Sequence, residues 1–230
     1  MKQKRECVVL FARSARGEGS AKRILRSRRL FERSQRLIAE AVRSLPGVDL
    51  ILSFVDRRDP CGETMAIAQR GSGFSERFHN AMCDAARLGY DRIVAIPIDV
   101  PELSGSHLQR ALLALRESPF VLGPSPDGGV YLIGFHANAM PALEDISWNT
   151  NRVFAQLAQA MPLAGVIEPL ADIDDASDVR ALLSQHLLDP QLKALLRTML
   201  NRAPAEREPV RCLQPRLLLS RLPARAPPLG

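Results

Sequence analysis

The chain has 230 residues, 46% of them hydrophobic, which is enough to bury one sizeable core and predicts a single domain with appendages. The net charge of +6 belongs to the two ends, because residues 1–36 hold twelve basic and three acidic side chains and residues 203–230 hold five and two, leaving 14 basic and 20 acidic residues between them. Only Phe11 and Phe31 are aromatic in those basic ends, so the composition argues against nucleic acid as a partner and favours solvated basic surfaces.

Several other classes of protein are excluded by what the sequence lacks. No apolar run reaches the roughly 18 to 20 residues that span a bilayer, and the first apolar run is too short and too close to charges for a signal peptide. The four cysteines form no CxxC pair and the four histidines are dispersed, so neither a disulfide framework nor a zinc cluster is expected. We therefore expect a cytoplasmic protein with no membrane span.

Strand-like and helix-like patterns alternate along most of the chain. Short apolar, β-branched runs predict strands at 7–12, 48–55, 93–98, 120–122, 130–135 and near 164–169. Apolar residues at helical spacing predict helices from about 24 to 42 and over 74–88, 105–117, 150–160, 176–187 and 190–201. This alternation predicts an α/β fold with one Rossmann-like, mainly parallel sheet and helices on both of its faces.

The C-terminal part of the sequence differs in composition from the alternating region. Residues 1–185 form the predicted α/β domain, and 186–202 form a C-terminal helix. Residues 203–230 contain six prolines in 28 positions, which predicts a tail that is disordered or docks as a short helix. The sequence contains no internal repeat.

One carboxylate stands at the end of an apolar run, in the segment RIVAIPIDVPEL (92–103). In open α/β sheets ligands bind outside the carboxyl ends of strands, where Asp99 is expected to lie. An N-cap role for Asp99 is disfavoured, because Ser104 is the better cap for the next helix. Pro97 and Pro101 fix the backbone, which suits a side chain that presents oxygen at a fixed angle. We therefore predict that Asp99 binds Mg²⁺ or Mn²⁺, ions that take one or two carboxylates plus substrate phosphates.

A second acidic segment, LADIDDASD, covers residues 170–178. Its later members have a structural explanation, as caps and dipole partners of the helix that begins near residue 176. Asp172 and Asp174 have no such explanation. One or two carboxylates of this segment are expected to face Asp99 across the edge of the sheet.

The first loop combines glycines and basic residues between a strand and a helix N-terminus. In the segment ARSARGEGSAKR (12–23) these are Arg13, Arg16, Gly17, Gly19, Lys22 and Arg23. Close backbone approach, a helix dipole and cationic side chains are typical of a phosphate-binding cradle, although the spacing matches neither the P-loop nor the dinucleotide motif. The alternative interpretation is a flexible basic loop.

Two further features indicate a ligand-binding pocket. The sequence Asp127-Gly128-Gly129 at the start of a strand lets the backbone approach a ligand closely, or merely makes a tight turn. Trp148, the only tryptophan, lies in the polar segment ISWNT, which is more typical of a pocket wall than of a core.

Taken in order, these segments resemble the GT-A superfamily of transferases. The segments are FARSARGEGSAKRIL, IPIDVPEL, VLGPSPDGGVYLIG with ISWNT, and LADIDDASD. The branch that they resemble comprises the bacterial arsenosugar-biosynthesis or radical-SAM/selenodomain-associated glycosyltransferases, and the resemblance covers residues 7–182. It implies a nucleotide-diphospho-sugar transferase fold with Mg²⁺ or Mn²⁺ at the active site.

The resemblance also implies roles for individual residues. Asp99 and Asp174 match the positions that hold the ion on the nucleotide's phosphates, and Lys22 matches a residue that counters phosphate charge. Asp127 matches the first residue of the turn that lines the acceptor or sugar side. Together these matches give Asp99, Lys22 and Asp127 as the expected catalytic residues. The expected nucleotide-binding residues are Arg13, Gly17, Gly19 and Lys22. The expected substrate-binding residues are Gly128, Gly129, Trp148 and Thr150.

The expected reaction is transfer from an activated nucleotide to an unidentified small-molecule acceptor, with charge on the departing diphosphate neutralised by the ion and Lys22. We favour a nucleotide sugar as the donor, and the alternative is a nucleotidyltransferase that uses a nucleoside triphosphate and releases pyrophosphate. A third alternative is a catalytically silent member of the family that binds a nucleotide or a partner protein. Two departures from the family's sequence motivate it: Pro97-Ile98 replaces Gly-Thr, and Arg23 replaces Thr. The sequence leaves open whether a homodimer forms.

Overall fold

The structure is a computed structural model of residues 1–230. It describes residues 4–13, 28–55, 65–140, 143, 145–148, 150–174, 176–184 and 188–202. The strands are β1 (Glu6–Ala12), β2 (Val48–Phe54), β3 (Met65–Ala68), β4 (Arg92–Ile96), β5 (Phe120–Pro124), β6 (Val130–His136) and β7 (Gly165–Val166). The helices are α2 (Arg28–Arg43), α3 (Phe74–Arg87), α4 (Gly105–Glu117), α5 (Val153–Ala160), α6 (Ala176–Leu183) and α7 (Pro190–Arg202), with a 3-10 turn at Ala137–Ala139.

The strands form one seven-stranded sheet in the order β3-β2-β1-β4-β6-β5-β7. Neighbouring strands are parallel except where β6 pairs with β4 and β5. The reversal of β6 follows from the short connection after β5, since a tight turn can join only antiparallel strands. The predicted α/β fold with a single, mainly parallel sheet is confirmed.

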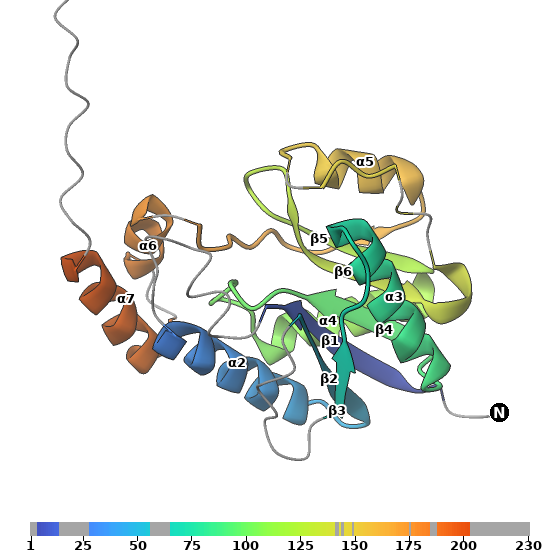
Figure 1. Ribbon diagram of the computed structural model, residues 1–230, viewed down its shortest axis with the longest axis horizontal. Coiled ribbons are helices and arrows are strands. Elements are labelled where there is room, and N and C mark those ends of the chain that lie inside the picture. The colour runs from blue at the N-terminus through green and yellow to red at the C-terminus, as the bar shows by residue number, and fades with distance from the viewer. Residues whose placement is uncertain are drawn as a thin grey trace, which may run out of the picture.

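Helices cover both faces of the sheet and create two hydrophobic cores. Along β1, Val8 and Leu10 belong to one core and Cys7 and Val9 to the other, and all four are fully buried. This alternation is the period of two expected for a strand buried on both faces. The core of Val8 also contains side chains of α2, α4, α6 and α7, whereas the core of Val9 contains side chains of α3 and α5. Figure 1 shows how these helices are arranged around the sheet.

The observed elements agree with the predicted ones where the local signal is strong. Helix α4 spans 105–117 as predicted, and Ser104 caps it in a capping box with His107. The prediction missed β3, because it has only four residues and follows a turn-rich segment. It also made β7 too long, since only two residues pair with β5.

The C-terminal helix packs onto the α/β sheet through α2. Leu192 and Leu196 of α7 are fully buried in the same core as Val8. The guanidinium of Arg33 in α2 donates two hydrogen bonds to Asp189, at 3.1 and 2.7 Å, just before α7 begins. The predicted tail, 203–230, lies outside the described residues. Among the helices that are described, none is long and apolar enough to cross a membrane.

Candidate active site

A cavity of about 680 Å³ lies at the carboxyl ends of the central strands. Its walls include the last residues of β1, the segment that follows β4, and the turn between β5 and β6. This is the end of an open parallel sheet at which ligands bind, and where the sequence places Asp99. Asp99 lines the cavity, as do Arg13, Asp127 and Asp174.

The backbone after β4 positions Asp99 by burying the residues on either side of it. Ile98 and Val100 are 1% and 2% exposed, so the intervening Asp99 side chain lies on the opposite side of the chain and reaches the cavity. The carbonyl of Asp99 accepts a hydrogen bond of 3.0 Å from the amide of Ile173. That bond fastens the segment 170–174 beside the loop that carries Asp99.

Three carboxylates converge at this junction. Oxygen atoms of Asp99, Asp172 and Asp174 all lie within 4.8 Å of one another. Ile173, which separates the last two, is 2% exposed, so that in an extended chain both of its acidic neighbours face the cavity. The amide of Asp174 donates a hydrogen bond of 2.8 Å to the carboxylate of Asp178, which holds the segment at the start of α6. We call these three residues the aspartate triad.

The environment of the aspartate triad favours a cation. Burial, together with the nearby charges of Asp99 and Asp174, raises the pKa of Asp172 to about 6. A set made only of carboxylate oxygens fits hard ions such as Mg²⁺ and Mn²⁺. The predicted pair Asp99 and Asp174 is therefore brought together, and Asp172 is a third member that the resemblance did not identify as a ligand. The alternating pattern Asp172-Ile173-Asp174 was the signal that could have identified it.

The turn between β5 and β6 brings Asp127 and Gly129 to the cavity wall. The Asp127 carboxylate accepts a hydrogen bond of 2.9 Å from the Gly129 amide, which stabilises the turn. Gly128 has φ of +90°, and a Cβ atom there would lie 2.1 Å from the carbonyl oxygen of Asn151. The carbonyl of Gly128 accepts a bond of 3.0 Å from Phe154, so this glycine joins the turn to α5 while its neighbours face the cavity.

An aromatic wall lines another side of the cavity. The ring of Trp148 lies 4.7 Å from that of Phe74 and 5.8 Å from that of Phe78, and Phe11 contacts both phenylalanines edge-on. Trp148 and Thr150, both predicted, line the cavity together with these rings. The Thr150 hydroxyl donates to the carbonyl of Ser147 at 2.7 Å, which braces the segment that carries Trp148. We call Phe11, Phe74, Phe78 and Trp148 the aromatic wall.

Two cavity residues, Gln69 and Arg77, were not predicted from the sequence. The amide nitrogen of Gln69 donates to the carbonyls of Ala12 and Ser53, at 2.9 and 2.7 Å, and so ties the ends of β1 and β2 together. Both of its amide hydrogens are thereby used, so the group that Gln69 can still offer is its carbonyl oxygen. Arg77 of α3 also lines the cavity, and its Nε atom is buried without a hydrogen-bond partner.

The remaining predicted residues divide between the cavity and the part of the chain that is not described. Arg13, at the end of β1, lines the cavity. Gly17, Gly19 and Lys22 of the predicted phosphate-binding loop lie outside the described residues, as does Arg23.

Comparison with known proteins relates this architecture to transferases. A family profile described as "Uncharacterized protein conserved in bacteria (DUF2064)" matches residues 54–150. No curated protein matches the chain. Among solved structures, a protein of Desulfovibrio desulfuricans G20, provisionally described as a nucleotide-diphospho-sugar transferase, superposes with a TM-score of 0.72 at 22% identity. The superposition covers 87% of this chain and 99% of the Desulfovibrio chain.

Two cytidylyl-compound synthases have the same fold. The 4-diphosphocytidyl-2C-methyl-D-erythritol synthase of Anaerococcus prevotii DSM 20548 superposes with a TM-score of 0.53 at 11% identity, over 84% of this chain and 96% of that one. The CMP:2-keto-3-deoxy-manno-octonic acid synthetase complexed with CTP superposes with a TM-score of 0.51 at 13% identity, over 80% and 100%. The chain therefore has the nucleotide-diphospho-sugar transferase fold that its sequence motifs predicted.

Proposed function

We propose that the protein is a metal-dependent transferase that uses a nucleotide-activated donor, and that the donor is a nucleotide sugar. The observation that carries the proposal is the aspartate triad, whose oxygens converge within 4.8 Å on the wall of a cavity at the carboxyl ends of the strands. Three carboxylates so close together repel one another and are stabilised by a cation. The cavity volume of about 680 Å³ lies in the range of pockets that bury a small-molecule ligand.

The triad is suited to hold Mg²⁺ or Mn²⁺, which when bound supplies positive charge against a nucleotide's phosphates. Asp99 lies between the buried residues Ile98 and Val100, and Asp172 precedes the buried Ile173, so their oxygens are positioned before a ligand arrives. Arg13 at the end of β1 adds a cation on the nucleotide side, and Lys22, in the loop that follows, is proposed to act beside it. The carbonyl oxygen of Gln69 is an acceptor suited to an N–H group of a nucleobase. These residues bind and orient the donor, and they neutralise the charge that develops on its leaving group.

Nucleotidyl transfer is the second candidate. It is supported by the cytidylyl-compound synthases, which share the fold and one of which is described as complexed with CTP. In this reaction the acceptor attacks the α-phosphate of a nucleoside triphosphate and pyrophosphate leaves. The higher TM-score of the Desulfovibrio protein, 0.72 against 0.51 and 0.53, favours glycosyl transfer.

Thermal unfolding with and without Mn²⁺ tests the proposal and separates the two reactions. UDP-, GDP- and CDP-sugars and nucleoside triphosphates are each added over a range of concentrations. A true ligand that reaches about 100 times its own dissociation constant should raise the melting temperature by about 5 °C or more. Mn²⁺-dependent stabilisation by one nucleotide sugar supports glycosyl transfer. Mn²⁺-dependent stabilisation by one nucleoside triphosphate, with none by the nucleotide sugars, supports nucleotidyl transfer.

Two asparagine variants provide the control. Asp99→Asn should remove the Mn²⁺-dependent stabilisation, whereas Asp145→Asn, at an exposed aspartate outside the cavity lining, should retain it. If no nucleotide stabilises the wild-type protein under any condition, both catalytic proposals fail.

A further inference from the structure

We propose that Arg77 and Trp148 form a subsite for an anionic group, a phosphate or a carboxylate, on the second substrate. The inference rests on the proposed function, because it assigns the nucleotide donor to the aspartate triad and leaves the facing wall for the acceptor. Its observations concern a different part of the cavity, the aromatic wall and the first turns of α3.

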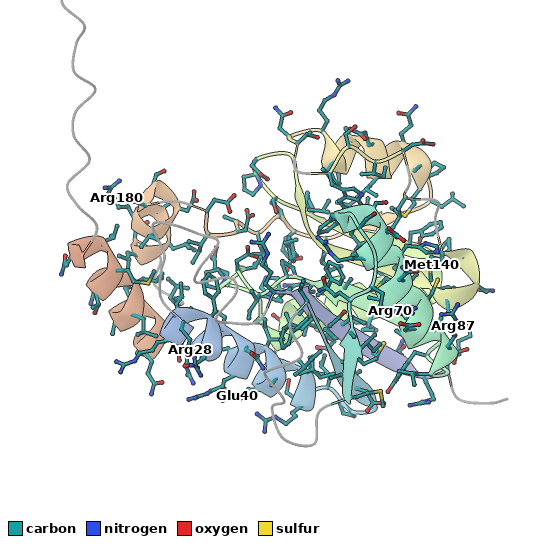
Figure 2. The ribbon with its side chains drawn as sticks, viewed as in Figure 1. Arg28, Glu40, Arg70, Arg87, Met140 and Arg180 are labelled. Carbon is teal, nitrogen blue, oxygen red and sulfur yellow. The ribbon has the colours of Figure 1, made fainter. Side chains whose placement is uncertain are left out.

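Arg77 of α3 differs from the two arginines that lie near it in the sequence, Arg70 before the helix and Arg87 at its last residue. Arg70 and Arg87 both pair with Asp84, at 2.6 and 2.9 Å, on the outer surface of the helix (Figure 2). Arg77 is partly buried and lines the cavity, and within the described part of the chain its guanidinium has no acidic partner. A permanently charged, partly desolvated group without a counter-ion is costly in the free protein. It is therefore a candidate for pairing with a bound anion.

Two buried nitrogen atoms on this wall also have no hydrogen-bond partner among the described residues. They are Nε of Arg77 and Nε1 of Trp148. A buried donor without an acceptor costs about 1–3 kcal/mol. Ser53 Oγ and Arg92 Nε are also buried without a partner, but only Arg77 and Trp148 among these four residues line the cavity. A bound anion would supply acceptors to the outer nitrogens of Arg77, and a small shift of either side chain would bring its covered N–H group into the same contact.

The aspartate triad and the aromatic wall, beside which Arg77 lies, are on different sides of the edge of the sheet. Phe74, Phe78 and Trp148 pack with the core beneath α3 and α5. The residues that flank the triad, Val100 and Ile173, belong to the core on the other face. The cavity thus has an acidic side and a cationic, aromatic side. A metal-bound diphosphate at the triad would leave Arg77 available to the other substrate.

The geometry of the wall identifies the chemistry that it would bind. A guanidinium is a planar fork that matches the paired oxygens of a carboxylate or phosphate. The aromatic rings around it offer an apolar surface to the carbon skeleton that carries this group. A hydrogen bond between the hydroxyl of Ser75 in α3 and the carbonyl of Leu143, at 3.0 Å, joins the helix of Arg77 to the segment of Trp148. The two donors are therefore held together in the absence of substrate.

The fluorescence of Trp148 tests the subsite directly, because this is the only tryptophan in the chain. Inorganic phosphate and malonate are titrated into the metal-free protein, and the emission is recorded. We expect a saturable change for at least one of the two anions in the wild-type protein. In Arg77→Gln the apparent dissociation constant should rise about 10-fold or more, the loss expected for a charge-assisted hydrogen bond.

Two further variants control for charge and folding. Arg87→Gln, which removes a surface arginine of the same helix, should titrate like the wild type. Arg77→Lys keeps the charge but lacks the fork, so its affinity should fall between those of the wild type and Arg77→Gln. If Arg77→Gln has lost cooperative thermal unfolding, Arg77→Lys alone decides, and an affinity equal to the wild type for both anions overturns the proposal. Absence of a saturable change in the wild type, or equal affinity in a folded Arg77→Gln protein, also overturns it.

A competition experiment distinguishes the second substrate from the donor. UDP, GDP and CDP are added with Mn²⁺ before the anion titration. Anion affinity that is unchanged or increased supports a separate subsite, whereas competitive displacement by a nucleotide assigns Arg77 to the donor's phosphates and overturns the assignment. An anion response that depends on Arg77 but is accompanied by no nucleotide binding would leave the subsite standing and remove the proposed function.

Discussion

Charged side chains are arranged in opposite ways at the two ends of the sheet. At the amino ends of the strands opposite charges meet, since Glu6 of β1 pairs with Arg92 of β4 at 2.6 Å and Arg5 with Asp49 at 3.4 Å. At the carboxyl ends like charges gather, with the oxygens of the aspartate triad within 4.8 Å of one another. The first arrangement stabilises the folded chain without a ligand, whereas the second costs stability that a bound cation would offset.

The same comparison extends to the groups that neighbour these charges. The Tyr90 hydroxyl donates to Asp49 at 2.6 Å, and the Arg5 guanidinium lies 4.3 Å from the centre of the Tyr90 ring. The guanidinium of Arg92 leaves its buried Nε without a hydrogen-bond partner but pairs with Glu6 through another nitrogen. In the cavity, Nε of Arg77 and Nε1 of Trp148 have no hydrogen-bond partner among the described residues. The two ends therefore differ in the charges that lie side by side, opposite charges at the amino end and like charges at the carboxyl end, and four variants test this difference.

The largest effect is expected from removing one carboxylate of the triad. Asp99→Asn should lower the proposed metal-dependent transfer by about 100-fold or more, because it removes one of the three proposed ligands of the ion. Its unfolding free energy in the absence of metal should stay equal or rise, because a like charge is removed. Initial rates and urea unfolding check the two parts. A marked loss of stability together with retained activity would place Asp99 among the residues that hold the fold.

At the amino end, breaking a pair should affect stability instead of binding. Glu6→Gln leaves Arg92, whose side chain is 14% exposed, without its close carboxylate, and should lower the unfolding free energy by roughly 2–3 kcal/mol. Nucleotide affinity, measured by calorimetry, should remain within about twofold because the site is at the far end of the strands. A loss of affinity at unchanged stability would contradict the division between the two ends.

The pKa of Asp172 predicts how the stability of the metal-free protein depends on pH. Since the folded-state pKa, about 6, lies above the ordinary value of 3.8, the Asp172 carboxyl is more protonated in the folded protein than in the unfolded chain between pH 4 and 6. The contribution of Asp172 to stability should therefore fall as the pH rises through this window, by on the order of 1 kcal/mol after solvent screening. Urea unfolding from pH 4 to 7 measures the effect.

Two conditions serve as controls for this titration. Asp172→Asn should flatten the fall between pH 4 and 6, whereas Asp145→Asn, at the exposed aspartate, should leave it in place. A fall of the same size in the Asp172 variant would mean that another group is responsible.

The smallest effect is expected at Tyr90. Tyr90→Phe removes the hydrogen bond to Asp49 but keeps the ring beneath Arg5, so the unfolding free energy should decrease by about 1 kcal/mol. Substrate kinetics should not change. Altered kinetics in this variant would indicate that the amino end of the sheet contributes to the site.

Features with a local signal could be predicted from the sequence, and features that depend on distant partners could not. The period of two in β1, the cap of α4 at Ser104 and the strand-end position of Asp99 are each determined within a few residues. The role of Arg77 is different, since its neighbours Arg70 and Arg87 are also arginines. Only the tertiary structure shows that those two pair with Asp84 and that Arg77 does not.

The same reason explains the incomplete prediction of the site. Asp172 becomes a member of the triad because the backbone of Ile173 bonds to that of Asp99, a contact between segments more than 70 residues apart. Gln69 reaches the cavity through bonds to the ends of β1 and β2, and β3, which precedes it, was itself too short to predict. Sequence patterns thus located the strand ends, and the pairing of those ends determined the site.

The central claim is that the aspartate triad binds a divalent cation together with a nucleotide. Crystals grown with Mn²⁺ and the stabilising nucleotide, and measured for the anomalous scattering of manganese, test it most directly. The account predicts one anomalous peak about 2.1 Å from carboxylate oxygens of at least two of Asp99, Asp172 and Asp174, on the phosphate side of the nucleotide. A bound nucleotide with no such peak, or a peak held by other residues, would contradict it.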